Sequence, residues 1–150
     1  MVVHRESIIH SMVEYKDKSI IAQMGVPSMK LPIQFALTYP EREESTVEPL
    51  DFTKYPKLTF FEPDLETFGC LRLALESMKE GGTMPLCLNA ANEVAVEYFL
   101  KEKIGFTDIE KTVETMLSGH KSLKGLSLED TLRLDKELKE KTKKYLEELS

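Results

Sequence analysis

Residues 3–13 read VHRESIIHSMV and residues 19–29 read SIIAQMGVPSM, and these two stretches predict where the chain forms β-structure. Both are rich in Ile, Val and Met. The segment between them, residues 14–18, is mainly polar and carries Asp-Lys at the turn. Two apolar strands joined by a short polar loop are typical of a β-hairpin, which we predict over residues 6–13 and 19–24.

Both faces of this hairpin carry apolar side chains. Regular alternation along the first strand places Ser7 and Ile9 on one face, and Ile8 and His10 on the other. Neither face is purely polar, so we expect both to be covered. Because an isolated two-stranded hairpin is marginally stable in water, it needs further strands, and few are available before it. The chain is therefore expected to be the back part of a larger protein.

The segment after the hairpin changes character twice. Gly25, Pro27 and Pro32 bracket a turn that leads into a short apolar helix over residues 31–37. Pro40 stops this helix. Residues 41–57 are charged and interrupted by proline, which predicts a surface connection. The apolar residues 58–61 can add one strand at its end. We place a domain boundary near residue 64.

From residue 65 onward the apolar residues recur with helical period. Leu71, Ala74, Leu75 and Met78 have the spacing of a buried helix face, and Gly81-Gly82 ends that helix. We therefore expect Leu75 to lie in the core.

Three more helices follow. One spans residues 84–102 with an apolar stripe that includes Leu88 and Phe99. The next opens with a capping box at residues 107–110. The last begins at residues 127–130 and runs towards residue 149. Short connections between helices of these lengths predict a four-helix bundle.

Composition and charge exclude several classes of function. The formal net charge is −6, which argues against nucleic acid as a partner, because binding phosphates needs clustered Lys and Arg. No apolar run approaches the roughly 20 residues that cross a bilayer, so no membrane segment is expected. Cys70 and Cys87 have neither metal-binding nor disulfide spacing and are expected to be buried free thiols. We expect a cytoplasmic chain.

A search for catalytic motifs finds none. The seven glycines form neither GxGxxG nor a P-loop, and there is no HExxH or Asp-rich loop. Ser7 and His10 are close in sequence, but regular alternation puts them on opposite sides of a strand. This disfavours a catalytic pair in which Ser7 is the nucleophile and His10 the general base. No catalytic, cofactor-binding or metal-binding residue is therefore expected in this chain.

Five ordered motifs nevertheless resemble one enzyme family. They are VHxxSIIHSMV at residues 3–13, AQxGxPxM at 22–29, PLDF at 49–52, LTF at 58–60 and LNAANE at 88–93. The chain resembles the C-terminal portion of the 1-deoxy-D-xylulose 5-phosphate reductoisomerase family. Ordered motifs over such a span are far more specific than any single one.

The resemblance implies an α+β chain in three parts: residues 1–40 from the tail of a catalytic domain, a connecting segment over 41–64, and the C-terminal helical bundle over 65–150. It implies an NADPH-dependent reductoisomerase that also needs a divalent metal (Mn, Mg or Co). In the family the metal carboxylates, the phosphate-binding cluster and the nucleotide-binding domain belong upstream. We therefore expect this chain alone to be inactive, and its partners to be the N-terminal part of the enzyme and a second subunit in a homodimer.

Four residues match positions that line the family's substrate pocket. The resemblance implies that Ser7 and His10 lie near the phosphorylated sugar, and that Pro27 and Met29 form an apolar wall. Each also has a structural interpretation: a partly buried histidine, a strand serine, and turn or core residues.

A rival hypothesis belongs to another class of function. The chain can be a stand-alone, non-catalytic helical interaction module that self-associates through its hairpin edge. The sequence that precedes residue 1 would distinguish the two hypotheses.

Overall fold

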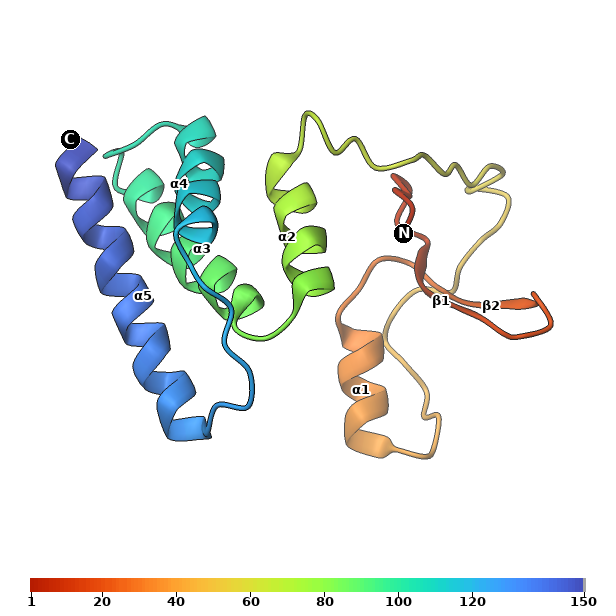
Figure 1. Cartoon of the computed structure of the whole chain (residues 1–150). Coiled ribbons are helices and arrows are strands. Elements are labelled where there is room, and N and C mark those ends of the chain that lie inside the picture. The colour runs from red at the N-terminus through yellow and green to blue at the C-terminus, as the bar shows by residue number, and fades with distance from the viewer. Residues whose placement is uncertain (150) are drawn as a thin grey trace. The chain divides into compact units, whose positions relative to one another are not determined.

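The computed structural model describes residues 1–149, and the chain divides into two compact units, one ending at Pro63 and the other beginning at Asp64. The first unit contains strands β1 (Ile9–Glu14) and β2 (Ile20–Met24) and helix α1 (Lys30–Thr38). The second contains α2 (Gly69–Glu80), α3 (Met84–Leu100), α4 (Phe106–Ser118) and α5 (Leu128–Leu149) (Figure 1). The predicted α+β fold, a hairpin and a short helix followed by four helices, is confirmed.

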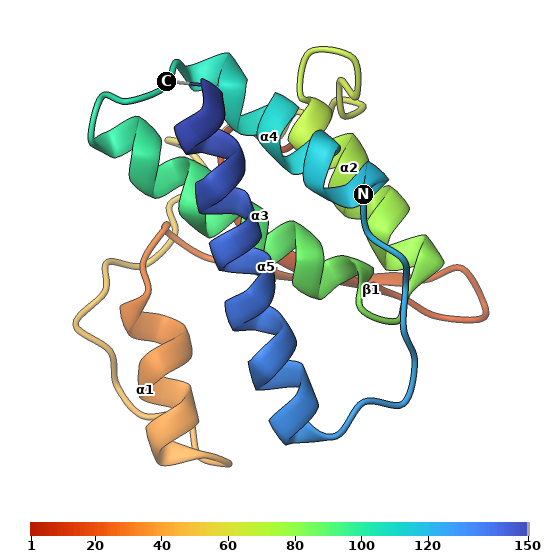
Figure 2. The same ribbon diagram turned by 60° about the vertical axis from the view of Figure 1, so that its left-hand side comes forward.

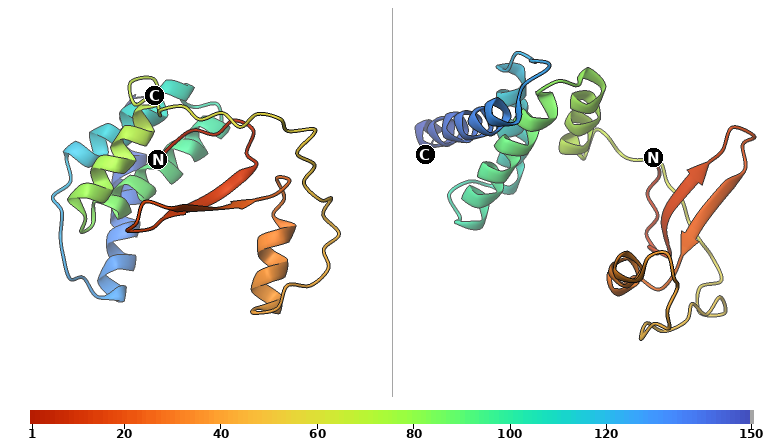
Figure 3. Two further views of the ribbon diagram at one scale, coloured as in Figure 1. Left: turned by 90° about the vertical axis from the view of Figure 1, so that its right-hand side faces the viewer. Right: turned by 90° about the horizontal axis from the view of Figure 1, so that it is seen from below.

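The hairpin is antiparallel and closes through a polar turn (Figure 3). The amide of Tyr15 donates to the carbonyl of Ser19 at 2.9 Å. The Asp17 carboxylate accepts from the amide of Ser19 at 3.0 Å, an arrangement in which a short polar side chain replaces a backbone partner. The turn lies where the sequence predicts it, although β1 begins at Ile9 rather than at residue 6.

A β-bulge interrupts the first strand. Ile9 pairs with Met24, but the next pair joins Ser11 to Gln23, so His10 is the extra residue on β1. Ser7 lies before the strand with φ of 52°, in the left-handed region. The predicted regular alternation from Ser7 to His10 is therefore wrong, because a left-handed residue and a bulge both break the period of two.

The hairpin remains a two-stranded sheet among the described residues. Val13, Ile20 and Ile21 are 56%, 59% and 63% exposed, so the expectation that both faces are covered is not met by the residues described. Residues 58–61 form no strand. Phe61 makes a single bridge to Val3, with reciprocal N–H···O bonds of 2.9 Å.

Helix α1 confirms the predicted short helix, and the connecting segment folds back onto it. The side-chain amide of Gln34 donates to the carbonyls of Glu43 and Glu44 at 3.1 and 2.8 Å. The guanidinium of Arg42 lies 4.0 Å from the ring centroid of Phe35. These contacts hold the first part of the charged segment within the same unit as the hairpin.

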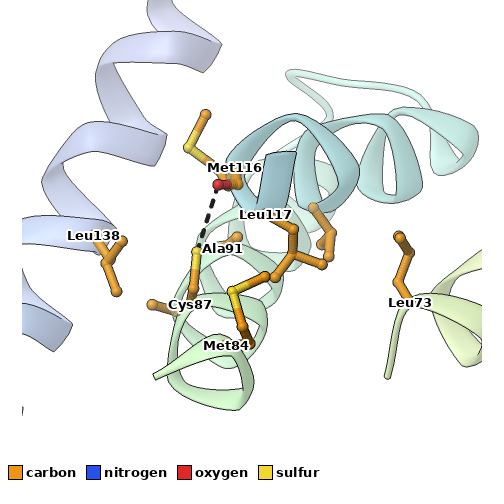
Figure 4. Close-up of a cluster of buried hydrophobic side chains, with 9 residues drawn as sticks. Leu73, Met84, Cys87, Ala91, Met116, Leu117 and Leu138 are labelled. Carbon is orange, nitrogen blue, oxygen red and sulfur yellow. Dashed lines mark hydrogen bonds between the residues drawn. The ribbon is translucent and has the colours of Figure 1, made fainter. Parts of the chain in front are cut away.

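In the second unit, α3 packs against each of the other three helices (Figure 2). Small residues on α3, such as Ala90 and Ala91, are buried and let its neighbours approach closely. Figure 4 shows the core cluster, in which the Cys87 thiol points towards the carbonyl of Met116 at 3.6 Å. The cluster consists of Leu73, Met84, Cys87, Ala90, Ala91, Val113, Met116, Leu117 and Leu138.

The helix ends follow local signals, with one correction. Ser127 caps α5 as predicted, since its hydroxyl accepts from the amide of Asp130 at 3.1 Å. The box at the start of α4 lies two residues earlier than predicted. The Asp108 carboxylate accepts from the amide of Gly105 at 2.9 Å, because glycine takes the N-cap position.

The buried face of α2 differs from the predicted one. Gly69, Leu73 and Ser77 are buried, whereas Leu75 is 37% and Met78 is 73% exposed. The close approach of α4 explains the choice of face, since a Cβ on Gly69 would lie 1.8 Å from the Glu110 carboxylate. The prediction that Leu75 lies in the core is wrong. Cys87 is buried as expected, but Cys70 is exposed.

None of the described helices is long and apolar enough to cross a membrane.

Candidate functional site

The four predicted pocket residues all lie in the first unit with exposed side chains. Ser7 and His10 flank the start of β1, and Pro27 and Met29 lie between β2 and α1. The amide of Gly25 donates to the carbonyl of Ile8 at 3.0 Å. This bond ties the residue after Ser7 to the turn that carries Pro27, so two segments separated in sequence meet at one end of the hairpin.

Ser7 has an uncommon backbone conformation. Its φ of 52° is rare for a residue with a Cβ, and its amide donates to the carbonyl of His4 at 3.2 Å in a tight turn. Sparsely populated conformations persist only where surrounding structure holds them, and they cluster at functional sites. The turn lifts Ser7 out of the strand and leaves its side chain exposed.

His10 is presented by the bulge. It lines a hollow of about 500 Å³ together with Ile9, Met12 and Phe60 among others. Ser7, Pro27 and Met29 are not among the residues that line this hollow. Bulges near active sites re-aim a side chain away from the regular strand direction, so His10 can present its imidazole where an ordinary strand residue would not.

Pro27 and Met29 form an exposed apolar approach to α1. Met29 is 71% exposed and its carbonyl accepts from the amide of Ile33 at 3.2 Å in the first turn of the helix. The hydroxyl of Ser28 accepts from the amide of Lys30 at 3.2 Å. Hydrogen bonds hold the backbone around Met29, while its flexible thioether side chain remains exposed.

A polar network next to Ser7 has no counterpart in the sequence analysis. His4 Nδ1 lies 2.9 Å from the carbonyl oxygen of Thr59, and Nε2 accepts from the amide of Ile8 at 3.2 Å. The Thr59 hydroxyl donates to Glu6 Oε1 at 2.6 Å and lowers the pKa of that carboxyl. No local sequence signal predicts the contacts with Thr59, because they join residues more than fifty positions apart.

The described residues form no metal site, and the sequence has no glycine-rich dinucleotide loop. No group of three or more His, Cys, Asp or Glu among them is placed to hold a metal ion. The amide of Asn89, a candidate ligand by residue type, donates to Glu93 at 2.9 Å, and Glu93 also pairs with Lys139 at 2.6 Å. These side chains stabilise the helical unit and leave no ligand set to assign.

An exposed polar turn and bulge beside an apolar loop, followed by a helical bundle, define an α+β protein with a candidate small-molecule pocket at the hairpin. A family model described as the DXP reductoisomerase C-terminal domain matches residues 24–141. The chain belongs to the DXP reductoisomerase family.

Known relatives agree over nearly the whole chain. The 1-deoxy-D-xylulose 5-phosphate reductoisomerase of Clostridium botulinum (strain Hall) is 56% identical over 141 residues, which cover 93% of this chain and 36% of that protein. The enzyme from Zymomonas mobilis in complex with NADPH has a TM-score of 0.90 and 48% identity over 97% of this chain and 39% of that one. A DOX-P reductoisomerase complex with NADPH, fosmidomycin and magnesium has a TM-score of 0.89 and 41% identity, covering 99% and 38% of the two chains. This chain thus spans well under half the length of these relatives.

Proposed function

We propose that this chain supplies part of the substrate pocket and the helical domain of an NADPH- and divalent-metal-dependent enzyme that converts 1-deoxy-D-xylulose 5-phosphate to 2-C-methyl-D-erythritol 4-phosphate. Family membership supports the reaction. The observation that carries the role of this chain is the left-handed Ser7 beside the bulged His10, both exposed at the end of the hairpin nearest the Pro27 turn.

The four residues have separate roles in this proposal. The Ser7 hydroxyl and the His10 imidazole hydrogen-bond to oxygens of the phosphorylated sugar, directly or through water. Pro27 and Met29 form the apolar wall that excludes water from one side of the substrate. None of the four transfers the hydride or holds the metal.

The cofactors belong to the part of the enzyme that lies outside this chain. Relatives have been solved with NADPH and with magnesium. Manganese shares the preference of magnesium for oxygen ligands, and cobalt is the third divalent metal in this proposal. Since the described residues offer neither a ligand group nor a dinucleotide loop, we expect residues 1–150 alone to bind no metal tightly and to oxidise no NADPH.

The domain organisation follows from the same proposal. Residues 1–40 complete the catalytic domain, residues 41–64 connect, and residues 65–150 form the C-terminal helical domain. The exposed apolar residues of the hairpin, such as Val13 and Ile21, support coverage by strands of the N-terminal part. We further propose a homodimer. We also propose a cytoplasmic location, which the two free cysteines support.

Family membership does not support the alternative of a stand-alone interaction module. The matched family model begins at Met24, the last residue of β2, and runs through α1 and the helices up to residue 141. A helical module that acts by itself has no physical need for an exposed Ser7 turn beside an apolar loop.

The test restores the missing part. Residues 1–150 are joined to the part of the Clostridium botulinum relative that precedes its matching region, and NADPH oxidation is followed by absorbance with 1-deoxy-D-xylulose 5-phosphate and manganese. We expect turnover from the joined protein and none from this chain alone, and sedimentation should show a dimer. A joined protein that is folded and binds NADPH but shows no substrate-dependent oxidation would overturn the proposed function.

A further inference from the structure

His4 is held at both ring nitrogens. Nδ1 lies 2.9 Å from the carbonyl oxygen of Thr59 and 3.1 Å from Glu6 Oε2, while Nε2 lies 3.2 Å from the amide nitrogen of Ile8. The ring stacks on Phe60 with centroids 4.9 Å apart. Only 8% of the His4 side chain is exposed, so this imidazole is largely buried and is held by both nitrogens and by one face.

The partners select one tautomer. A backbone N–H can only donate, so Nε2 must offer its lone pair to Ile8. A backbone carbonyl can only accept, so Nδ1 must carry the proton that is shared with Thr59. The neutral ring protonated at Nδ1 satisfies both contacts at once, and the tautomer protonated at Nε2 satisfies neither.

These contacts surround Ser7. The amide of Ser7 donates to the His4 carbonyl at 3.2 Å, and the next amide, that of Ile8, donates to the His4 ring. On the other side of Ser7, the Glu6 carboxylate accepts two hydrogen bonds from Thr59. The Thr59 amide donates at 3.2 Å and the Thr59 hydroxyl at 2.6 Å. Ser7 therefore lies between two anchored neighbours, which is what a strained left-handed residue requires.

We propose that His4 is a positioning residue that acts through Ser7: its imidazole fixes the left-handed turn and thereby aims the Ser7 hydroxyl at the substrate. The inference rests on the proposed function, in which the Ser7 hydroxyl hydrogen-bonds to the substrate. With both nitrogens engaged, His4 has no ring donor or acceptor left for the substrate itself, so its effect on the reaction passes through Ser7.

The first test needs no activity and uses the chain as it is. A long-range ¹H–¹⁵N spectrum should show a pyrrole-type Nδ1 and a pyridine-type Nε2 for His4. In His4→Phe, which keeps a ring to stack on Phe60 but removes both nitrogens, the Ile8 amide should exchange about two- to tenfold faster. The amide of Val94, in the separate helical unit, is the reference and should not change. An Nε2-protonated ring, or unchanged Ile8 exchange in His4→Phe, overturns the inference.

The second test uses the joined enzyme and a double-mutant cycle. Ser7→Ala, His4→Phe and the double variant are compared by kcat and KM, with His4→Gln as the conservative variant. If His4 acts through Ser7, the double variant loses no more kcat/KM than Ser7→Ala alone. His4→Gln should recover part of the loss, because its amide oxygen can accept from Ile8.

The outcomes separate this inference from the proposed function. Losses that multiply in the double variant, with Ser7→Ala impaired, show that His4 has only a structural role and leave the function intact. A silent Ser7→Ala in an active enzyme removes both the pocket role of Ser7 and the positioning role of His4, even where the tautomer is as expected.

Discussion

Gly82 faces Ser122 so closely that a Cβ atom in place of its hydrogen would lie 2.4 Å from the Ser122 hydroxyl oxygen and 2.5 Å from the carbonyl oxygen of Leu123. The segment after α4 is held there by two further bonds. Ser122 donates to the carbonyl of Gly81 at 3.1 Å, and the amide of Leu123 donates to Thr83 Oγ1 at 3.0 Å. The α2–α3 turn and the segment before α5 are thus packed backbone to backbone.

We predict that Gly82→Ala destabilises the protein by about 2–5 kcal/mol, because alanine meets both an unfavourable left-handed φ and a steric clash. Gly125→Ala is the matched control. Gly125 also has positive φ, at 71°, but a Cβ there meets nothing within 4 Å, so its cost should be only about 1–2 kcal/mol. Denaturant titration of both variants measures the difference, and equal costs would show that the contact with Ser122 is not tight.

The stability of the helical unit should fall as His120 becomes protonated. His120 Nε2 lies 2.8 Å from Thr83 Oγ1, and burial, together with Lys141, lowers the pKa of His120 below its ordinary value of 6.5, although Glu80 acts in the opposite direction. The unfolded chain therefore binds more protons than the folded chain between the two pKa values. The stabilisation is complete above pH 6.5 and is lost as the pH falls through the folded pKa.

Denaturant titrations between about pH 7.5 and 5.5 check this, because most carboxylates titrate lower. His120→Gln keeps hydrogen-bonding capacity without the charge and should flatten the profile over that range. An identical slope in His120→Gln would assign the pH dependence to other groups.

The two cysteines should differ in reactivity. Burial raises the pKa of Cys87 to about 11, and its side chain is fully enclosed, so it offers neither thiolate nor access. Cys70 is exposed at the surface. Partial desolvation of its thiol and the nearby Glu110 raise the pKa of Cys70 as well. Native alkylation at pH 8, read by mass spectrometry, should modify Cys70 and spare Cys87. Both should react after denaturation, and native modification of Cys87 would contradict the packing of the core.

Leucine substitutions on α2 test which face of the helix is buried. Leu73→Ala should cost about 2–5 kcal/mol through lost burial and cavity formation, because Leu73 is 5% exposed. Leu75→Ala, the same change two residues along, should cost less than about 1 kcal/mol. Denaturant titrations with the opposite ranking would restore the face that the apolar spacing alone indicates.

That helix shows where sequence reasoning reaches its limit. Helix α2 carries two opposed stripes, and the exposed one, which contains Leu75 and Met78, is the more apolar in sequence. The buried one contains Ser77 and Gly69, and the missing side chain of Gly69 lets α4 approach. Hydrophobic period detects the helix but cannot rank the two faces, because the choice depends on a neighbour thirty-odd residues later.

The hairpin that carries Ser7 and His10 is also predicted only in part by the sequence. Residues 3–29 predict two strands and a turn, and the structure has them. The left-handed Ser7 and the bulge at His10 leave no signal in the local pattern, and His4, next to that turn, contacts Thr59 in a distant segment. Alternation therefore misplaces Ser7 and His10, because a left-handed residue and a bulge break the period of two.

The pocket itself is tested by Ser7→Ala and Met29→Ala in the joined enzyme. If Ser7 bonds to the substrate as proposed, removing its hydroxyl leaves a substrate oxygen without its partner and should lower kcat/KM by roughly five- to two-hundredfold, which corresponds to about 1–3 kcal/mol. Met29→Ala removes an exposed apolar contact and should mainly raise KM. Ser19→Ala is the control for Ser7, since it deletes the same hydroxyl at the opposite end of the hairpin, where the Ser19 hydroxyl donates to the turn residue Asp17 at 2.7 Å.

Direct titrations decide what the two pocket variants have lost. NADPH and manganese should bind both variants as they bind the unmodified joined enzyme, because this chain contributes neither a dinucleotide loop nor a ligand group among its described residues. A loss of manganese affinity in Ser7→Ala would place the hydroxyl at the metal rather than at the sugar. Unchanged kinetics in both variants, with Ser19→Ala equally silent, would leave Ser7 and Met29 as structural residues of the turn and the helix start.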